Sequence, residues 1–392
     1  MSGAVSGARL GIMVVGHCGS TGSTLLGTAA LLREKILSWS QIPSSLPDDL
    51  AVAEMEPTIS AAGWDFPAAP FPEVLSSHAL IPAHLLAKLD PGNLAVPRFD
   101  PVVTALDFDA GRSGRLPARA TVRDGVKLVA SDIEAFKANP GCDRPVVLYL
   151  GSPARPASPP LADVTSWSEL LARPADEVPA GVIYAAAAVE AGADFVDFTP
   201  SESLVCPALW SRSAAAGLQL AGRDGSTGET MLKAAVATML SLRGLRLRSW
   251  YSSNHLGNRD GLVLSDPDFS WLKIADKKRG LAELTGSNDF DHVVSIDFVR
   301  SKGDRKEAFA SVVAEDIFGS EVNLRLNWQA WDSALAVPML LDLVRLVAIG
   351  QRLGLAGVQP QLGYFFKAPL GIRCESPERA HSRMIEFYTA GR

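Results

Sequence analysis

Two lysines, Lys273 and Lys277, stand four residues apart after a run of polar residues and glycines. If this segment is helical, both side chains lie on one face of the helix. Two ammonium groups on one face repel each other unless an anion lies between them, so such a face suits a phosphate or a developing oxyanion. The polar run before them contains Asn254, His255, Asn258 and Asp260.

A glycine-rich loop near the start of the chain has the order of elements that a dinucleotide site needs. The apolar run 10–15 predicts a buried strand, residues 16–22 form the loop GHCGSTG, and residues 23–36 predict a helix. Glycines let the backbone approach a pyrophosphate, and the helix N-terminus favours its negative charge. Because Cys18 stands where the usual GxGxxG pattern has a glycine, a plain tight turn explains this loop alone equally well.

Asp107 follows the run 102–106, which we expect to be the second strand. An acid in this position binds the ribose hydroxyls of a dinucleotide and favours NAD over NADP. Its distance from Gly22 is far longer than the usual ~20 residues. The proline-rich stretch 40–100, which we interpret as an insertion or surface layer, accounts for the difference.

A second loop, residues 222–230, reads GRDGSTGET and precedes an apolar helical run. Its amides and hydroxyls could hold a phosphate at the helix N-terminus, but helix capping by Ser226 or Thr227 explains the loop equally well. The charged run 302–306 is typical of a solvated turn. Lys367 lies among aromatic residues, where desolvation would lower its pKa and free the amine for proton transfer.

The histidines give no Ser–His–Asp pattern, so lysines and aspartates are the catalytic candidates. This set suits enolisation and carbonyl chemistry rather than hydrolysis. With 392 residues the chain is long enough for about two domains, and its hydrophobic (47%) and charged (20%) fractions are those of an ordinary globular protein. The net charge of −6 argues against a broad nucleic-acid or anionic-membrane surface.

The four cysteines lie far apart without metal-ligand spacing, so we expect no metal site and a reduced, cytoplasmic protein. We see neither a signal peptide nor an apolar run of the ~18 residues that a membrane span needs. Strands and helices alternate through the first part of the chain, which predicts an α/β fold with a doubly wound parallel sheet. From residue 245 longer strands of an antiparallel or mixed sheet are expected at 247–251, 292–299 and 322–331, followed by an apolar helix at 339–353.

Four motifs occur together in the order seen in one enzyme family. The run NHLGNxDG at 254–261, the Lys273/Lys277 pair, GDxK at 303–306 and KAP at 367–369 resemble the signature of myo-inositol-1-phosphate synthases, also called inositol-3-phosphate synthases. The likeness covers the glycine loop and most of the chain from about residue 146 to 369. Several motifs in one order are far more specific than any one of them.

The resemblance implies a Rossmann-type NAD-binding domain at 1–244, with the 40–100 insertion. It implies an inserted α+β sheet domain at 245–336 for oligomerisation and catalysis, a segment at 337–392 that completes the Rossmann domain, and a homotetramer. The resemblance assigns NAD binding to Gly16, Cys18, Gly19, Ser20, Thr21, Gly22, Asp107, Asp224, Asn258, Asp304 and Ser333. It assigns substrate and phosphate binding to Thr227, Gly228, Glu229, Thr230, Asn254, Leu256 and Lys277, and catalysis to Asp260, Lys273, Lys306, Asp332 and Lys367.

Both glycine-containing loops depart from the family pattern. The first reads GHCGSTG where GxGGNNG is frequent, and in the second Ser226 and Glu229 replace a lysine and a glutamine. An added acid near a phosphate is unfavourable unless it is turned away or neutralised.

The implied activity is the NAD-dependent, net redox-neutral cyclisation of D-glucose 6-phosphate to 1D-myo-inositol 3-phosphate. Its steps would be oxidation at C5, enolisation, an intramolecular aldol reaction and reduction. A related cyclase could instead convert D-fructose 6-phosphate to a five-membered cyclitol phosphate for carbocyclic nucleoside biosynthesis. A non-catalytic NAD-binding sensor and a simple NAD-dependent dehydrogenase are the other interpretations.

Overall fold

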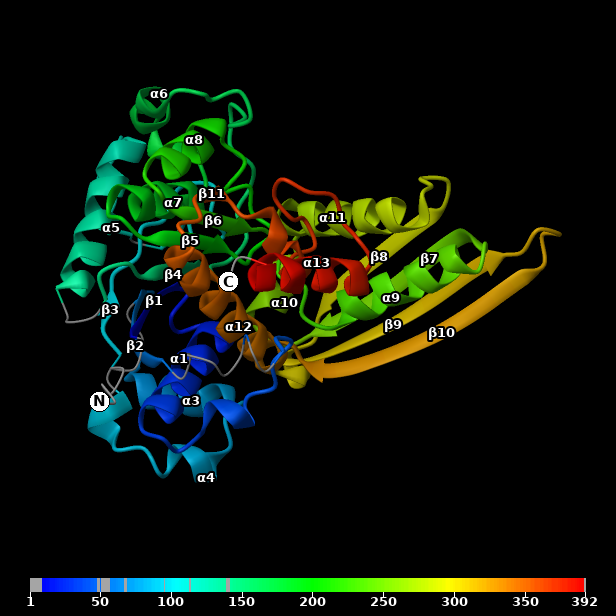
Figure 1. The fold of residues 1–392 in the computed structure, drawn as a ribbon, viewed down its shortest axis with the longest axis horizontal. Coiled ribbons are helices and arrows are strands. Elements are labelled where there is room, and N and C mark those ends of the chain that lie inside the picture. Colours follow the sequence, from blue (N-terminus) through cyan, green and yellow to red (C-terminus); the bar gives the residue numbers. More distant parts are fainter. Residues whose placement is uncertain are drawn as a thin grey trace.

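Two sheets organise the chain (Figure 1). The computed structural model describes residues 9–390 except 48–49, 51–56, 67–68, 95, 113 and 139–141. The larger sheet is parallel and has seven strands in the order β11-β6-β5-β4-β1-β2-β3. Its strands are β1 (Arg9–Val15), β2 (Thr58–Trp64), β3 (Arg98–Phe99), β4 (Val146–Tyr149), β5 (Asp194–Asp197), β6 (Gln219–Gly222) and β11 (Gly357–Val358).

Helices cover both faces of this sheet, which confirms the doubly wound arrangement. Along β1, Met13 and Val15 join the core beneath one set of helices, whereas Ile12 and Val14 join the core beneath the other set. Because both faces are buried, the strands read as continuous apolar runs. The helices are α5 (Val122–Lys137), α7 (Ala180–Glu190) and α8 (Pro207–Ala215) on one side, and α1 (Ser20–Arg33) and α12 (Asp332–Arg352) on the other.

The second strand of the sheet is not where the sequence indicated. Residues 102–106 form a loop, so the prediction of a strand there was wrong; β2 pairs with β1 along all seven of its residues. It lies inside the 40–100 stretch that we interpreted as an insertion, part of which falls outside the described residues. Small residues give β2 a weak apolar pattern, and a Cβ at Gly63 would lie 2.3 Å from the Val14 carbonyl oxygen.

The second sheet is mixed and has four strands in the order β10-β9-β7-β8. Strand β7 runs parallel to β8 and antiparallel to β9, which pairs antiparallel with β10. The strands at 247–251, 292–299 and 322–331 are confirmed, but β9 was missed because it begins inside the charged run 302–306. The strands are β7 (Arg246–Leu256), β8 (Asp291–Phe298), β9 (Arg305–Glu315) and β10 (Glu321–Trp331).

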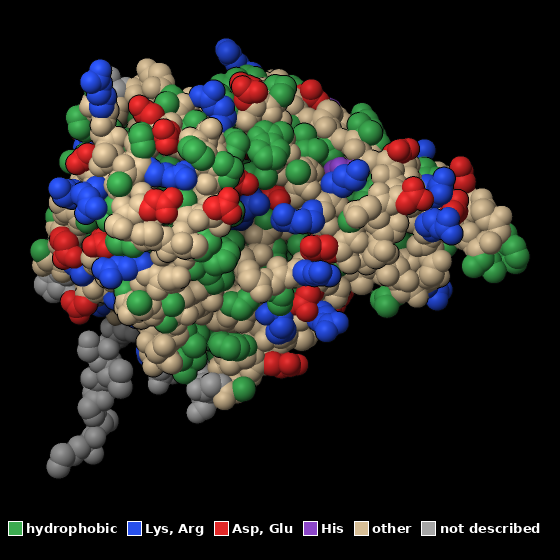
Figure 2. All heavy atoms as spheres, turned by 90° about the horizontal axis from the view of Figure 1, so that it is seen from above, with side chains coloured by type: hydrophobic (Ala, Val, Ile, Leu, Met, Phe, Trp, Pro, Cys, Tyr) green, Lys and Arg blue, Asp and Glu red, His purple; other side chains and the backbone are tan. Residues whose placement is uncertain are grey.

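Two helices, α9 (Glu229–Leu242) and α11 (Pro267–Thr285), pack on one face of this sheet. Leu240 of α9 and Leu281 of α11 share a core with Trp250 and Val312 of the strands. The opposite face is more open. Figure 2 shows charged side chains of both signs interspersed over the molecule, and apolar side chains at the far end of this sheet, where the turn after β9 carries Ile317 and Phe318, each 85% exposed.

The chain returns to the larger sheet through α12 and β11, which pairs with β6. Among the described residues α12 is the one helix that is long and apolar enough to cross a membrane, but 72% of its most apolar window is buried inside the protein. It begins at Asp332, before the expected run 339–353, and its internal charges, Asp342 and Arg345, are buried and paired at 3.4 Å. The remaining elements are α3 (Phe71–His78), α4 (Ala83–Leu86), α6 (Trp167–Ala172), α10 (Arg259–Leu264), α13 (Pro377–Ala390), and the short 3₁₀ turns η1 (Trp39–Gln41), η2 (Pro91–Leu94), η3 (Ala175–Glu177), η4 (Arg300–Lys302) and η5 (Pro360–Phe365).

Candidate active site

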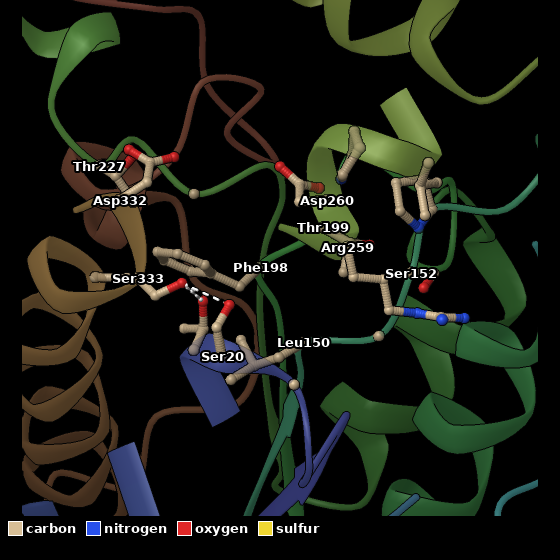
Figure 3. Close-up of a pocket in the computed structure, with 18 of the residues that line it drawn as sticks. Ser20, Leu150, Ser152, Phe198, Thr199, Thr227, Arg259, Asp260, Asp332 and Ser333 are labelled. Carbon is tan, nitrogen blue, oxygen red and sulfur yellow. Dashed lines mark hydrogen bonds between the residues drawn. The ribbon is translucent and has the colours of Figure 1, made fainter. Parts of the chain in front are cut away.

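A cavity of about 170 Å³ lies where the carboxyl ends of the parallel strands meet the second sheet and its helices (Figure 3). We call it the central cavity. Ligand sites of doubly wound folds lie outside the carboxyl ends of their strands. The polar side chains on its wall are Ser20, Thr21, Ser152, Thr199, Asp224, Thr227, Asn258, Arg259, Asp260, Lys273, Asp332, Ser333 and Lys367.

A larger cleft of about 470 Å³ adjoins the central cavity and runs along the first glycine loop. We call it the glycine-loop cleft. Its wall includes Gly16, Cys18, Asp65, Asp107 and Asp304. The two spaces share wall residues from the start of α1, the loop after β4 and the start of α10, so the glycine loop and the lysines border one continuous space.

The glycine loop leaves its backbone open to a ligand. Gly16 has φ +88, and a Cβ there would lie 2.7 Å from the Leu150 carbonyl oxygen. A Cβ at Gly22 would lie 2.2 Å from the Gly16 carbonyl oxygen, so the loop can turn this tightly only with glycine. Gly19 is the N-cap residue of helix α1, which has no side-chain cap and no acid in its first turn. Its positive end is therefore available to a pyrophosphate.

The acid that follows the second strand is Asp65, not Asp107. Asp65 comes directly after β2, and its Oδ2 accepts a hydrogen bond of 2.7 Å from the Cys18 amide of the glycine loop. Burial raises the pKa of this carboxyl. The sequence did contain a sign of this position, because an acid, Asp65, directly follows a short run of residues at 58–64 that are compatible with a strand.

Asp107 instead fastens its own loop. Its Oδ2 accepts from the Thr104 amide at 2.7 Å and its Oδ1 accepts from the Ala180 amide, at the start of α7, at 3.2 Å. Burial raises its pKa to about 6. Asp107 still borders the glycine-loop cleft. Its carboxylate is engaged with two backbone donors, as is that of Asp65, whose Oδ1 accepts from the Phe66 amide at 2.8 Å.

Lys367 and Asp224 face the central cavity as an ion pair of 2.7 Å. Asp224 follows β6 and holds φ 57, a conformation that is uncommon for a residue other than glycine. Backbone hydrogen bonds fix it there: its amide donates to the Thr199 carbonyl at 2.8 Å, and its carbonyl accepts from the Lys367 amide at 2.7 Å.

Lys273 of α11 points at Asp260 in the first turn of α10, with 3.3 Å between Nζ and Oδ2. Asn258 caps α10 by accepting from the Gly261 amide at 3.0 Å, which orients this turn. Burial alone would lower the pKa of Lys273, but the carboxylates of Asp260 and Asp224 outweigh it and raise that pKa. Lys273 is therefore a cation in the cavity wall.

Lys277 and Lys306 lie deeper and share one carboxylate. Glu229 Oε2 lies 3.1 Å from Lys277 Nζ and 3.5 Å from Lys306 Nζ. Lys306 also faces Asp332 Oδ2 at 3.8 Å, and Asp332 accepts from the Thr227 hydroxyl at 2.9 Å. Carboxylates of the chain itself therefore hold the lysines together, which corrects the expectation that only a bound anion could do so.

A polar network joins the glycine loop to the second sheet. Asp304 Oδ1 accepts from Asn258 Nδ2 at 2.7 Å and from Ser333 Oγ at 2.7 Å. Ser333 Oγ in turn lies 2.9 Å from Ser20 Oγ and accepts from Thr21 Oγ1 at 3.1 Å (Figure 3). Residues from α1, α10, α12 and the turn before β9 thus meet between the cleft and the cavity, as the sequence motifs predicted for one site.

Comparisons with known proteins agree with the family resemblance of the sequence motifs. A family described as myo-inositol-1-phosphate synthase matches residues 228–333. The inositol-3-phosphate synthase 1 of Bacteroides thetaiotaomicron is 29% identical, over 94% of this chain and 91% of that protein. The inositol-3-phosphate synthase 1 of Bos taurus is also 29% identical, over 92% of this chain and 74% of that protein.

This chain is similar to myo-inositol-1-phosphate synthases, through the family match at residues 228–333 and through relatives that align over most of its length. It is an isomerase-type enzyme. The crystal structure of inositol-3-phosphate synthase from Caenorhabditis elegans has the same fold, with a TM-score of 0.85 at 19% identity over 99% of this chain and 86% of that one. A myo-inositol-1-phosphate synthase-related protein from Thermotoga maritima superposes with a TM-score of 0.74 at 19% identity, over 97% of this chain and 98% of that one.

Several residues assigned through the family resemblance lie outside the central cavity. Asn254 and Leu256 are buried in β7 on the face that α9 and α11 cover, and Asn254 Nδ2 donates to the Ser295 carbonyl at 3.2 Å. Neither lines the central cavity or the glycine-loop cleft. Thr230 and Lys277 line a smaller cavity behind Lys367, between α9, α11 and the C-terminal segment. Gly228 packs close to the Trp328 ring.

Several charged residues of this region escaped the sequence analysis, and Lys233 is one of them. Lys233 of α9 is buried, with Nζ 3.4 Å from Ser252 Oγ and 4.9 Å from the centre of the Trp250 ring. Burial, reinforced by the nearby charge of Lys277, lowers its pKa to about 7. The available signal was a single lysine in an otherwise apolar helical run, four residues after Glu229.

Proposed function

We propose that the protein is an NAD-dependent cyclase that converts D-glucose 6-phosphate to 1D-myo-inositol 3-phosphate without net oxidation. The observation that carries this proposal is the continuous space between the glycine loop and the lysine–carboxylate pairs of the central cavity. It is supported by relatives named inositol-3-phosphate synthase over most of the chain.

The residues of the glycine-loop cleft fit a dinucleotide. Gly16, Gly22 and the uncapped start of α1 would hold the pyrophosphate, and Asp65 would hold the ribose hydroxyls. The hydrogen-bond network of Asp304 borders the passage from the glycine-loop cleft to the central cavity. The nicotinamide would lie in this passage. When bound, NAD supplies a reversible acceptor for the hydride of C5, so it is regenerated in each turnover.

The lysines divide the remaining work according to their positions. Lys367, paired with Asp224, would move the proton of the C5 hydroxyl during oxidation and return it during reduction. Lys273 and Lys306 would stabilise the enolate oxygen and the oxygen at C1 during ring closure. Asp260 and Asp332 orient these two cations, and Lys277 would bind the phosphate.

A second substrate is favoured by one observation. The carboxylate of Glu229 lies among the lysines. This departure from the family's phosphate loop is compatible with D-fructose 6-phosphate as the substrate and a five-membered cyclitol phosphate as the product. Purified protein should be incubated with NAD and each sugar phosphate, and the products identified by NMR. Inositol monophosphate from glucose 6-phosphate without NADH accumulation is the expected result.

Other outcomes of that assay would reassign the protein. A cyclopentane product from fructose 6-phosphate would replace the six-membered ring in the proposal. Stoichiometric NADH accumulation would indicate a simple dehydrogenase. NAD binding without any turnover would indicate a sensor.

We further propose that residues 245–336 form a catalytic and oligomerisation domain of a homotetramer. The register places Tyr251 opposite Val293 and Ser253 opposite Phe309 on the open face of the second sheet. The three apolar side chains of this group are 47%, 54% and 43% exposed, and a partner subunit would cover them. Light scattering that finds an active monomer at micromolar concentration would contradict this proposal.

A further inference from the structure

Glu229 occupies the centre of the deepest cation cluster. It is the first residue of α9, it is 6% exposed, and one oxygen, Oε2, lies within 3.5 Å of both Lys277 Nζ and Lys306 Nζ. Burial would favour its neutral form, but these two lysines and Lys233 hold its pKa well below the usual range. The charged form of this side chain is therefore favoured by the lysines around it.

An incoming phosphate oxygen would seek the same position. Anions are attracted by the positive end of α9 and by paired ammonium groups, and Glu229 Oε2 already satisfies both lysines there. In the described part of the chain the neighbourhood contains five lysines, Lys233, Lys273, Lys277, Lys306 and Lys367, and four carboxylates, Asp224, Glu229, Asp260 and Asp332. With four negative charges against five bases, little positive charge is left for a phosphate dianion.

We propose that Glu229 is a built-in competitor for the substrate phosphate: the phosphate binds to Lys277 only as Glu229, which also pairs with Lys306, releases Lys277. This inference rests on the proposed function, because that function brings a sugar phosphate to these lysines. Glu229 then sets phosphate affinity. It disfavours small anions such as inorganic phosphate, which lack the further contacts of a sugar and cannot compensate for displacing the carboxylate.

The competition has a structural counterpart. Without a ligand, Glu229 keeps two buried cations paired, and leaving such cations unpaired destabilises a protein. A neutral residue at this position should therefore lower the melting temperature of the free protein. Added phosphate should raise the melting temperature of the neutral variant more than it raises that of the unchanged protein, because tighter binding to the folded state gives a larger stabilisation by mass action.

The test is equilibrium binding rather than turnover. Sulfate and inorganic phosphate are titrated calorimetrically into the full-length protein, Glu229→Gln and Glu229→Met. One charge removed at contact distance from the anion corresponds to at least ~10-fold tighter binding by both neutral variants. Glu190→Gln is the matched control, since Glu190 pairs with Arg212 at 3.2 Å on the surface of the larger sheet's helices; its affinity should not change.

The result that overturns the proposal is unchanged or weaker anion binding by the folded neutral variants. Circular dichroism identifies which variant is folded, and Met fills the same volume if Gln does not fold. Product analysis tests the proposed function separately. Tighter phosphate binding by Glu229→Gln together with no cyclised product from either sugar would reject the proposed function and leave the competition established.

Discussion

Lys367 Nζ lies 2.7 Å from Asp224 Oδ1, although 143 positions separate the two residues in the chain. Their backbones are joined as well, because the Lys367 amide donates to the Asp224 carbonyl at 2.7 Å and the Arg223 amide donates to the Ala368 carbonyl at 3.1 Å. The C-terminal segment thus delivers a lysine to the loop after β6 and locks it there. A lysine whose counterion is fixed can exchange a proton with a bound hydroxyl without searching for its position.

Lys367→Ala should lower turnover at least ~100-fold, the scale for losing a positioned acid or base. NAD affinity should stay unchanged because Lys367 borders the central cavity and not the glycine-loop cleft. Lys367→Arg keeps the positive charge but cannot give up its proton, so it should be equally inactive. Product formation by NMR and NAD titration by fluorescence separate these effects, and near-normal turnover of Lys367→Arg would contradict a proton-transfer role.

Lys306→Ala should lose both activity and stability. Turnover should fall at least ~100-fold because an electrostatic group is lost. The melting temperature should also fall, since Asp332 would lose its nearest cation and Glu229 one of two, and breaking a buried pair costs on the order of 3–5 kcal/mol. Repulsion among the lysines alone would instead predict a more stable protein.

A matched control exists in η4, the turn before β9. Lys302 pairs with Glu307 at 2.6 Å, but its side chain is 23% exposed. Because partly exposed pairs contribute little, Lys302→Ala should leave the melting temperature and turnover nearly unchanged. A Lys306→Ala protein as stable as Lys302→Ala would show that the Glu229 and Asp332 contacts do not stabilise the fold.

Substituting Asp65 and substituting Asp107 should have different effects on NAD binding and on the melting temperature. Asp65→Asn should weaken NAD binding by about 10-fold or more, since the residue follows β2 and faces the cleft beside the Cys18 amide. Asp107→Asn should mainly lower the melting temperature, because an amide cannot accept from both the Thr104 and Ala180 backbone groups. NAD titration and thermal unfolding of both variants would detect a reversal of these roles.

The sequence was most informative where the spacing of residues along the chain matches the repeat of a helix or the apolar run of a buried strand. Lys273 and Lys277 both lie in α11, the helix that places them on one face, and the apolar run 10–15 is part of β1. Strand β2 was not predicted because it lacks a continuous apolar run. Ser60, Gly63 and two alanines pack against β1 by their small size rather than by apolar area. The sequence analysis therefore took Asp107 as the acid after the second strand, whereas Asp65 is the residue that follows β2.

Pairings between distant residues could not be read from spacing. Lys306 looked like part of a solvated turn, yet it begins the inner face of β9 opposite α9 and α11. Glu229 looked unfavourable beside a phosphate, and only the fold shows that two lysines from different elements neutralise it. Lys233 carried no motif at all. Its low pKa arises from burial against Trp250, which the sequence does not reveal.

Lys233 should make anion binding depend on pH. Its pKa is lowered to about 7, so it is charged below that pH and neutral above it. Lys277 of α11 loses its charge at a higher pH than Lys233, because burial lowers its pKa to about 8 while Glu229 opposes that shift. Burial lowers the pKa of His292 of β8 to about 3, so His292 is neutral across this range. Lys306 of β9 and Glu229 stay charged, since the pKa of the first is raised and that of the second is lowered. Sulfate, a dianion throughout this range, should therefore bind more weakly as the pH rises from 6 to 9.

Lys233→Met should remove the part of this pH dependence that is centred near pH 7 and leave the part near pH 8. Stability gives an independent readout. The folded-state pKa of Lys233 lies below its ordinary value of 10.5, so the unfolded chain binds more protons between pH 7 and 10.5, and this residue's contribution to the free energy of unfolding rises with pH across that window. The advantage in melting temperature of Lys233→Met over the unchanged protein should accordingly be largest at pH 6 and shrink towards pH 9. Parallel sulfate-binding and melting curves for the two proteins would show instead that Lys233 keeps one charge state throughout.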